Sequence, residues 1–297
     1  MQNLTIEGVS KSFDGVPALR DVSFTVGGGQ KVALLGHNGA GKTTLMKAIL
    51  GLQAADSGHI EVLGSAPGSA RARAQVAYLP ENVAFHSALT GREQMRLYLR
   101  LRRQPARLAD DLLERVGLGA AARRRIGTYS KGMRQKVGLA QALIGQPRLL
   151  ILDEPTSGLD PVARRDFYAI LDDLARGGAS ILLSSHALTE VEARTDRIVI
   201  LSRGAVVADD TLIGLRAQAG LPTHIQIAAR SGAADEVAER LRAGRRNGVM
   251  VELTCSPEDK LTRLGEITAL GPLVRDLDVV PPSLDDIYEH FSRRAEK

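Results

Sequence analysis

The segment from Gln30 to Leu50 constrains the fold of this chain more than any other part of its sequence. It opens with QKVALL, which is apolar at consecutive positions, as expected for a strand buried on both faces of a sheet. The strand leads directly into a glycine-rich turn, and the turn leads into a segment of helical character. A strand, a glycine-rich turn and a helix in this order favour an α/β fold with a mainly parallel sheet.

The turn itself matches the pattern GxxxxGK[ST] of phosphate-binding loops, from Gly36 to Thr43. Its glycines let backbone N–H groups surround a polyphosphate, and the start of the helix adds partial positive charge. We expect Lys42 to neutralise the β and γ phosphates and the Thr43 hydroxyl to bind Mg²⁺. An ordinary glycine-rich turn is the alternative, and the flanking strand and helix argue against it. The residues predicted to contact the nucleotide here are Gly36, His37, Asn38, Gly39, Ala40, Gly41, Lys42, Thr43 and Thr44.

A second apolar strand ends in two carboxylates. Four aliphatic residues, Leu149 to Leu152, precede Asp153 and Glu154. Ligands of parallel sheets lie at the carboxyl ends of the strands, where these two side chains emerge. Asp153 is suited to hold Mg²⁺ through water, and Glu154 to orient or deprotonate an attacking water. A simple acidic turn is the alternative, and the phosphate loop in the same chain makes it the weaker one.

Composition excludes several classes of protein. The single cysteine, Cys255, rules out an intramolecular disulfide and a cysteine metal cage. Aromatic residues make up 3% of the chain, too few to favour a surface that stacks nucleic-acid bases. We find no signal peptide and no apolar run of the roughly 20 residues that span a bilayer, so we expect a protein soluble by itself. The basic run Arg123 to Arg125 fits a solvated helix face, with a membrane-side or subunit contact as the alternative.

The pattern of the chain predicts two domains. Strand-like and helix-like segments alternate up to about residue 208, except over residues 85–145, where the period is helical. Within that stretch Thr90 and Glu93 have the spacing of a capping box, Pro105 is expected to open a second helix, and Ser130 precedes a third. We predict a nucleotide-binding domain over 1–220, with a helical subdomain at about 85–145, and a small α/β accessory domain over 221–297. The accessory domain fits either a dimer-stabilising or a regulatory role.

The segment Tyr129 to Gln135 resembles the signature sequence of ATP-binding-cassette (ABC) ATPases, usually LSGGQ, and the resemblance extends over the first 210 residues. It implies a P-loop NTPase fold of the ABC ATPase type, with a mixed sheet core and a helical subdomain, that hydrolyses ATP with Mg²⁺. It also implies a homodimer in which Ser130, Lys131 and Gly132 face the γ-phosphate bound by the partner copy. A helix start at Ser130 is a ready anion site. Met133 stands where a glutamine contact is expected, which puts that contact in doubt.

Four more positions take a role from this resemblance alone. Phe13 stands where an aromatic ring stacks on adenine, although a core phenylalanine fits equally well. Asp160 lies in the loop that connects the two sites. His186 matches a histidine that contacts the γ-phosphate and holds the hydrolytic water, with a structural histidine as the alternative. Glu81 replaces the usual glutamine near Mg²⁺ and the coupling surface. A glutamate accepts a hydrogen bond from metal-bound water but cannot donate one, so hydrolysis should survive.

A single cassette without a spanning segment resembles the energy-coupling subunit of a transporter. The resemblance implies a separate integral membrane permease and a peripheral position on the cytoplasmic side of the inner membrane. The rival class is a non-transport ABC ATPase that acts on nucleic acid or ribosomes. The stretch of about 85 residues between phosphate loop and signature has no sustained heptads of the kind found in chromosome and repair types, so no nucleic-acid partner is expected.

Among transporter ATPases the chain most resembles the NosF type, and a generic exporter-type cassette is the alternative. The closing segment at 281–288, PPSLDDIY, resembles exporter-type cassettes, which implies efflux of a drug, lipid or polysaccharide. His37, Glu81 and the signature region resemble the NosF-type ATPases of NosDFY complexes, which support copper-site assembly of nitrous oxide reductase. That resemblance implies a NosY-like permease and, indirectly, a periplasmic NosD-like protein. One cysteine and five scattered methionines form no soft-ligand cluster, so copper or sulfur would be handled elsewhere.

Overall fold

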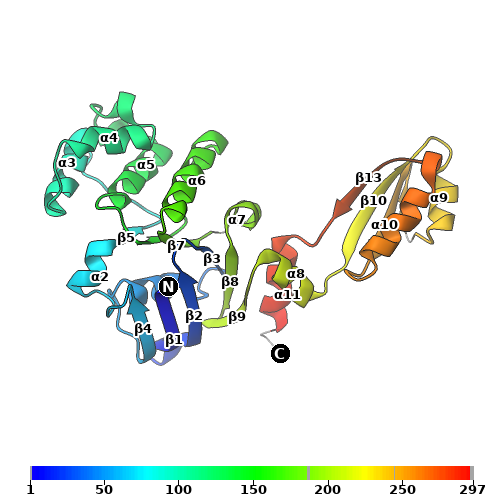
Figure 1. Cartoon of the computed structure of the whole chain (residues 1–297), viewed down its shortest axis with the longest axis horizontal. Helices are drawn as coiled ribbons and strands as arrows, with labels where there is room; N and C mark the ends of the chain where they lie inside the picture. Colours follow the sequence, from blue (N-terminus) through cyan, green and yellow to red (C-terminus); the bar gives the residue numbers. More distant parts are fainter. Residues whose placement is uncertain (1, 186–187, 244, 295–297) are drawn as a thin grey trace. The chain divides into compact units, whose positions relative to one another are not determined.

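A computed structural model describes residues 2–185, 188–243 and 245–294 of the chain. The chain divides into two compact units, Met1–Asp209 and Asp210–Lys297 (Figure 1). The boundary predicted from the sequence, at residue 220, lies about ten residues later. The helix in this interval, α8 (Leu212–Ala219), packs against α11 (Leu284–Arg294), and Arg216 Nε donates to the Pro282 carbonyl at 3.1 Å. Tertiary contact with α11 therefore assigns α8 to the second unit.

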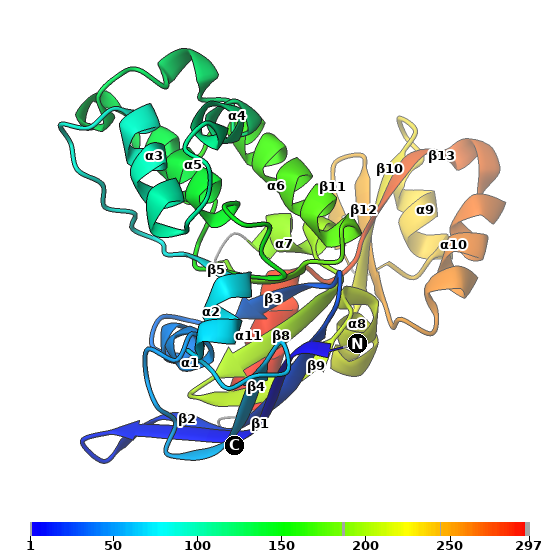
Figure 2. The same cartoon turned by 60° about the vertical axis from the view of Figure 1, so that its left-hand side comes forward.

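The first unit is built on a six-stranded sheet with the order β5-β6-β7-β3-β8-β9. Figure 2 labels β5, β3, β8 and β9 of this sheet. Neighbouring strands from β5 to β8 run parallel, as the alternation of strands and helices predicts. β6 and β7 are buried along their whole length, because both faces of the parallel sheet are covered. The carboxyl ends of β3, β6 and β7 therefore meet at one edge. The strands are β5 (Val76–Leu79), β6 (Leu149–Leu152), β7 (Ser180–Ser184), β3 (Lys31–Leu35), β8 (Arg197–Ser202) and β9 (Ala205–Asp210).

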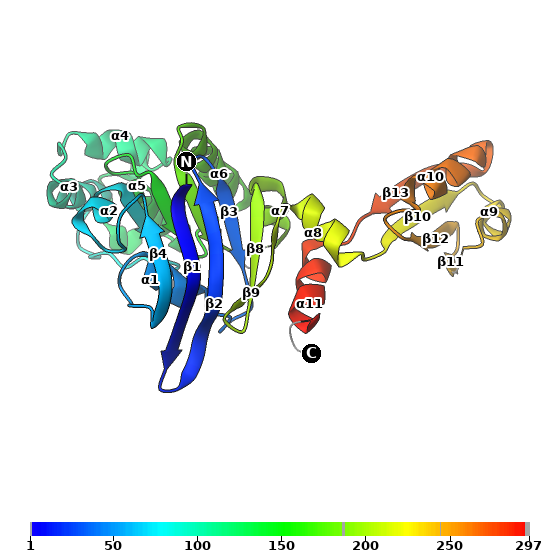
Figure 3. The same ribbon diagram turned by 60° about the horizontal axis from the view of Figure 1, so that its bottom comes forward.

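A three-stranded antiparallel sheet packs beside it, with β1 (Gln2–Phe13) between β2 (Val16–Gly27) and β4 (Ser57–Val62) (Figure 3). Asp14 and Gly15, both with positive φ, form the tight turn between β1 and β2. Both sheets share one buried core with α1 (Lys42–Ile49), to which Leu45 and Met46 of the helix contribute. This packing fixes α1, whose first turn follows the glycine-rich loop.

The helices of the first unit begin mostly where the sequence predicts. Thr90 and Glu93 form the predicted capping box of α3, and Ser130 caps α5. Pro105 does not open a helix, because residues 105–107 form a turn in which Leu108 N donates to the Pro105 carbonyl, and α4 begins only at Leu108. The helices are α2 (Ala70–Gln75), α3 (Gly91–Leu101), α4 (Leu108–Arg115), η1 (Gly119–Ala121), η2 (Ile126–Thr128), α5 (Lys131–Ala142), α6 (Pro161–Arg176) and α7 (Leu188–Arg194).

The second unit contains a four-stranded antiparallel sheet with the order β11-β12-β10-β13. Ile225 and Val251 of this sheet share a buried core with Val237 of α9 and Ile267 of α10. Across the described ranges of the chain, no helix is long and apolar enough to cross a membrane. The elements are β10 (Thr223–Ala229), α9 (Ala234–Arg240), β11 (Arg245–Asn247), β12 (Met250–Cys255), α10 (Lys260–Ala269), η3 (Gly271–Leu273) and β13 (Val274–Val280).

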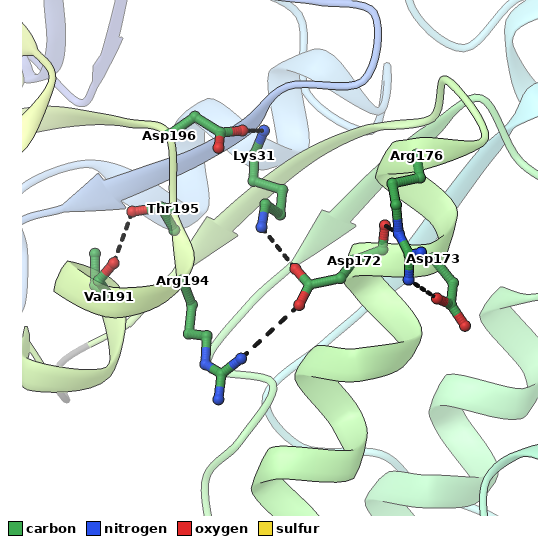
Figure 4. Close-up of polar contacts among 8 residues, drawn as sticks. All are labelled: Lys31, Asp172, Asp173, Arg176, Val191, Arg194, Thr195 and Asp196. Atoms are coloured by element: carbon green, nitrogen blue, oxygen red, sulfur yellow. Dashed lines mark hydrogen bonds and ion pairs between the residues drawn. The ribbon is translucent and has the colours of Figure 1, made fainter.

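One carboxylate ties helices α6 and α7 to the start of β3 (Figure 4). Asp172 of α6 accepts a hydrogen bond from Lys31 Nζ at 2.6 Å and lies 3.8 Å from Arg194 Nη1 at the end of α7. Asp196 fixes the same point, because Lys31 N donates to its carboxylate at 2.8 Å. The Lys31 side chain is 17% exposed, so its ion pair is only partly screened by solvent.

We expect Asp172→Asn to lower the free energy of unfolding by about 1 kcal/mol, because it removes the charge that faces both cations. The neighbouring residue provides a matched control. Among the residues that the structure describes, Asp173 pairs only with Arg176, and both of those side chains are largely exposed, so Asp173→Asn should leave stability nearly unchanged. Urea denaturation of the three proteins measures this difference, and equal losses in the two variants would contradict it.

Candidate active site

The loop between β3 and α1 depends on close packing of its glycines against the backbone. Gly41 has a φ of 105°, and a Cβ atom at this position would lie 2.5 Å from the Ala18 carbonyl oxygen. A Cβ atom at Gly36 would lie 2.7 Å from the carbonyl oxygen of Leu201. Only glycine fits these two positions without a shift of the backbone, which explains why they stand at the two ends of the loop.

The loop borders a cavity of about 250 Å³ at the carboxyl edge of the parallel sheet. The structure brings the phosphate-loop residues together there with Asp153, Glu154 and Glu81, which lie far apart in the sequence. Gly36 precedes the lining residues and starts the loop. The cavity is lined by Ala18, His37, Asn38, Gly39, Ala40, Gly41, Lys42, Thr43, Thr44, Glu81, Asp153 and Glu154.

Lys42 is the cation of this cavity. Its Nζ donates to the carbonyl oxygens of Gly36 at 2.5 Å and His37 at 3.2 Å. Burial lowers the pKa of Lys42, and the nearby carboxylates of Glu154 and Asp153 act in the opposite direction. An anion in the cavity would offset the desolvation of the ammonium group, and a polyphosphate has the charge to do so.

Asp153 is buried, with 8% of its surface exposed, and both of its carboxylate oxygens are engaged. Ser184 Oγ donates to Oδ1 at 2.6 Å, and Thr43 Oγ1 lies 3.4 Å from Oδ2. Ser184 Oγ also accepts a hydrogen bond from Glu154 N at 3.0 Å. Sequence reasoning missed Ser184. The available signal was its place as a polar residue at the end of an apolar strand that could neighbour the strand of Asp153.

The donor set around Asp153 fits Mg²⁺. A carboxylate and a hydroxyl are hard oxygen ligands, and Mg²⁺ usually takes one or two protein carboxylates together with substrate phosphates and water. Within residues 2–185, 188–243 and 245–294, no group of three or more His, Cys, Asp or Glu side chains is arranged to hold a metal ion. Asp153 and Thr43 therefore suit a magnesium ion that binds together with a nucleotide.

Glu154 has a left-handed backbone conformation, with a φ of 48°. A residue other than glycine adopts this conformation only where its surroundings enforce it, and such residues cluster at functional sites. Here the hydrogen bond from Glu154 N to Ser184 holds the backbone, and the half-buried side chain lines the cavity. The carboxylate is thus presented to the cavity beside Asp153.

Other residues predicted for the site lie outside the lining of this cavity. Phe13 is 44% exposed at the turn between β1 and β2, where Lys11 Nζ lies 5.5 Å from its ring centroid. Ala18, on the following strand, lines the cavity instead. His186 lies outside the described residues.

The signature residues and Asp160 meet at a second location. Ser130 Oγ accepts from Met133 N at 3.1 Å at the start of α5, and Lys131 Nζ donates to Ser157 Oγ at 2.9 Å. A Cβ atom at Gly132 would lie 3.1 Å from the Gly158 carbonyl oxygen. Asp160 caps α6 by accepting from Ala163 N at 2.8 Å, and this backbone hydrogen bond lowers its pKa. The starts of α5 and α6 are thus joined through the 157–160 loop.

Comparison with known proteins gives consistent matches. The family described as ABC transporter matches residues 19–157. The daunorubicin resistance ATP-binding protein DrrA3 of Streptomyces coeruleorubidus is 33% identical and aligns over 97% of this chain and 95% of its own length. The Nod factor export ATP-binding protein I of Rhizobium johnstonii is 35% identical and aligns over 98% of this chain and 95% of its own length. A solved structure titled as the ATP binding subunit of an ABC transporter superposes with a TM-score of 0.68 at 36% identity, over 73% of this chain and 93% of that one.

The loop geometry predicts unequal costs for two alanine substitutions. Gly41→Ala should destabilise the chain by about 1–3 kcal/mol, because its Cβ would overlap the Ala18 carbonyl. Gly39 also has positive φ, but a Cβ there meets nothing within 4 Å, so Gly39→Ala should cost clearly less. Chemical denaturation of both variants tests the difference, and a larger loss for Gly39→Ala would refute the close-packing account.

Proposed function

This chain belongs to the family of ABC transporter ATP-binding proteins, and from that premise we propose that it powers export through a separate integral membrane permease. The observation that carries the proposal is the single cavity shared by the phosphate loop, Asp153 and Glu154. A peripheral position on the cytoplasmic side of the inner membrane belongs to the same proposal.

The phosphate loop and the carboxylates of the cavity have distinct parts in the proposed hydrolysis of ATP. The loop N–H groups and Lys42 hold the β and γ phosphates, while Thr43 and Asp153 hold Mg²⁺ and Glu81 lies beside them. The metal ion, when bound, neutralises charge on the phosphates. Glu154 orients the attacking water and takes its proton. Phe13 is proposed to stack on adenine, and His186 to contact the γ-phosphate.

We propose that two copies of the chain complete each site. Ser130, Lys131 and Gly132 lie at the start of the 12-residue helix α5, whose unpaired N–H groups favour an anion, yet they do not line the cavity of their own chain. A homodimer in which this helix start meets the γ-phosphate held by the other copy gives them a ligand. Asp160 would then link one site to the other through the 157–160 loop.

Export is supported by relatives that match both units. The proteins named for daunorubicin resistance and Nod factor export align over 95% of their own lengths, including the region of the second unit. Efflux of a drug, lipid or polysaccharide is therefore the first candidate for this chain. The rival class, action on nucleic acid or ribosomes, has no comparable support.

A NosF-like role is the second candidate, and specific residues favour it. These are His37 in the phosphate loop, Glu81 beside it and the segment 128–156, which includes the signature. Both His37 and Glu81 line the cavity. In this role a NosY-like permease and a periplasmic NosD-like protein would handle copper or sulfur for nitrous oxide reductase, since this chain has a single cysteine.

Two identical substitutions in one cavity separate the proposed base from its neighbour. Glu154→Gln should reduce the ATPase rate by at least about 100-fold, because an amide cannot take a proton from water. Glu81→Gln should retain hydrolysis, since an amide oxygen still accepts a hydrogen bond from metal-bound water. Phosphate-release assays measure both rates. A Glu154→Gln variant with full activity would remove Glu154 from its proposed role.

Purification from native membranes in mild detergent distinguishes the transport candidates. A co-purifying permease is expected, and recovery of nucleic acid or ribosomes without one would refute the transport role. A NosD-like protein together with loss of nitrous oxide reductase activity in a deletion strain would identify the NosF-like role. A permease alone, with the reductase intact, would leave export of another substrate.

A further inference from the structure

Positive charge is concentrated in one part of the chain. Residues 85–145 contain eleven arginines and two lysines against four acidic residues, a net charge of +9, whereas the whole chain carries +5. The remainder of the protein is therefore net acidic. A charge asymmetry of this kind indicates a surface that meets an anionic partner. The cavity uses none of these residues.

Helix α3 carries much of this charge on its exposed side. Arg96 and Arg100 are four residues apart, so they lie on one face of the helix. Arg103 is also exposed and follows two residues after the helix ends, where its φ is positive. Leu97 and Leu101 lie beside them and are 40% and 71% exposed. The opposite side of α3 is buried through Met95 and Leu99, so these two leucines are extra to the core.

Three arginines of this face form no ion pair among the described residues. Within the part of the chain that the structure describes, Arg96, Arg100 and Arg103 have no carboxylate at ion-pair distance. Glu93, three residues before Arg96, is engaged by the backbone and hydroxyl of Thr90, and those hydrogen bonds lower its pKa, with smaller contributions from Arg125 and Arg96. Arg125 lies near the start of α3, where it forms a β-bridge with Thr90, and it acts on the carboxylate of Glu93.

We propose that this surface, defined by Arg96, Leu97, Arg100, Leu101, Arg103 and Arg125 and called the α3 basic face, binds the anionic phospholipid headgroups of a membrane. Exposed arginines next to exposed leucines on one helix face are the composition of interfacial helices, in which the cations meet headgroups and the apolar side chains enter the boundary below them. A surface for single-stranded nucleic acid would offer aromatic rings for stacking, whereas the exposed apolar residues of this face are leucines. The bilayer is therefore the better fit.

Vesicle co-sedimentation of the purified full-length chain tests this proposal. The wild type should bind vesicles of phosphatidylcholine mixed with phosphatidylglycerol and not vesicles of phosphatidylcholine alone. The triple variant Arg96→Gln, Arg100→Gln, Arg103→Gln should bind the anionic vesicles at least about tenfold more weakly. Its ATPase rate should equal that of the wild type, because none of the three residues lines the cavity.

A charge-matched control separates the face from net charge. Arg240→Gln, Arg275→Gln and Arg293→Gln together remove the same charge from exposed positions of the second unit and should leave vesicle binding unchanged. Equal losses in both triple variants, or equal wild-type binding to both kinds of vesicle, would overturn the proposal. Binding to a DNA duplex without binding to anionic vesicles would overturn it as well and identify nucleic acid as the partner.

The leucines supply an independent arm of the test. Leu97→Ser with Leu101→Ser should weaken binding to anionic vesicles and make the residual binding more sensitive to salt, because burial of apolar side chains is not screened by ions. Unchanged affinity and salt dependence in this variant would contradict the proposal that Leu97 and Leu101 enter the membrane. These measurements need no permease and no ATP, so their failure would leave the proposed transport function standing.

Discussion

The buried carboxylate of Asp153 is the point on which the site depends. It joins three segments, because it stands at the end of β6, accepts from Ser184 at the end of β7, and faces Thr43 at the start of α1. Parallel pairing brings these strand ends to one edge, and the shared core with α1 keeps the loop in register with them. A buried carboxylate without these donors would cost free energy of folding. The same hydrogen bonds therefore stabilise the fold and hold the carboxylate oxygens in position as ligands.

The sequence predicts those features that local chemistry decides. Consecutive apolar residues identify β3 and β6, and the capping-box spacing identifies the start of α3. The fold class follows from the alternation of strands and helices together with the phosphate-loop pattern, and the structural and sequence relatives confirm it. The grouping of Lys42, Asp153 and Glu154 could also be anticipated, because all follow strands that a parallel sheet aligns.

Features decided by distant contacts were not available from the sequence. Pro105 has the residue type of a helix start, but the turn before Leu108 delays α4. Helix α8 has no local signal for its unit, and contact with α11 decides it. Ser184 gains its role only because β7 pairs with β6, 31 residues away along the chain from its acceptor. The arginines of α3 could be read from the sequence, but only the structure shows that Arg96, Arg100 and Arg103 form no ion pair among the described residues.

We propose that each ATP site is completed by two copies of the chain. One copy supplies the cavity of the phosphate loop, and the other supplies the start of α5, which is suited to anions. A crystal structure of the Glu154→Gln variant with ATP and Mg²⁺ tests this proposal most directly. The account predicts a triphosphate against Lys42 and Thr43, Mg²⁺ near Asp153, and Ser130 and Gly132 of a second copy at the γ-phosphate. A nucleotide bound away from Lys42, or a γ-phosphate met by the signature residues of its own chain, would contradict it.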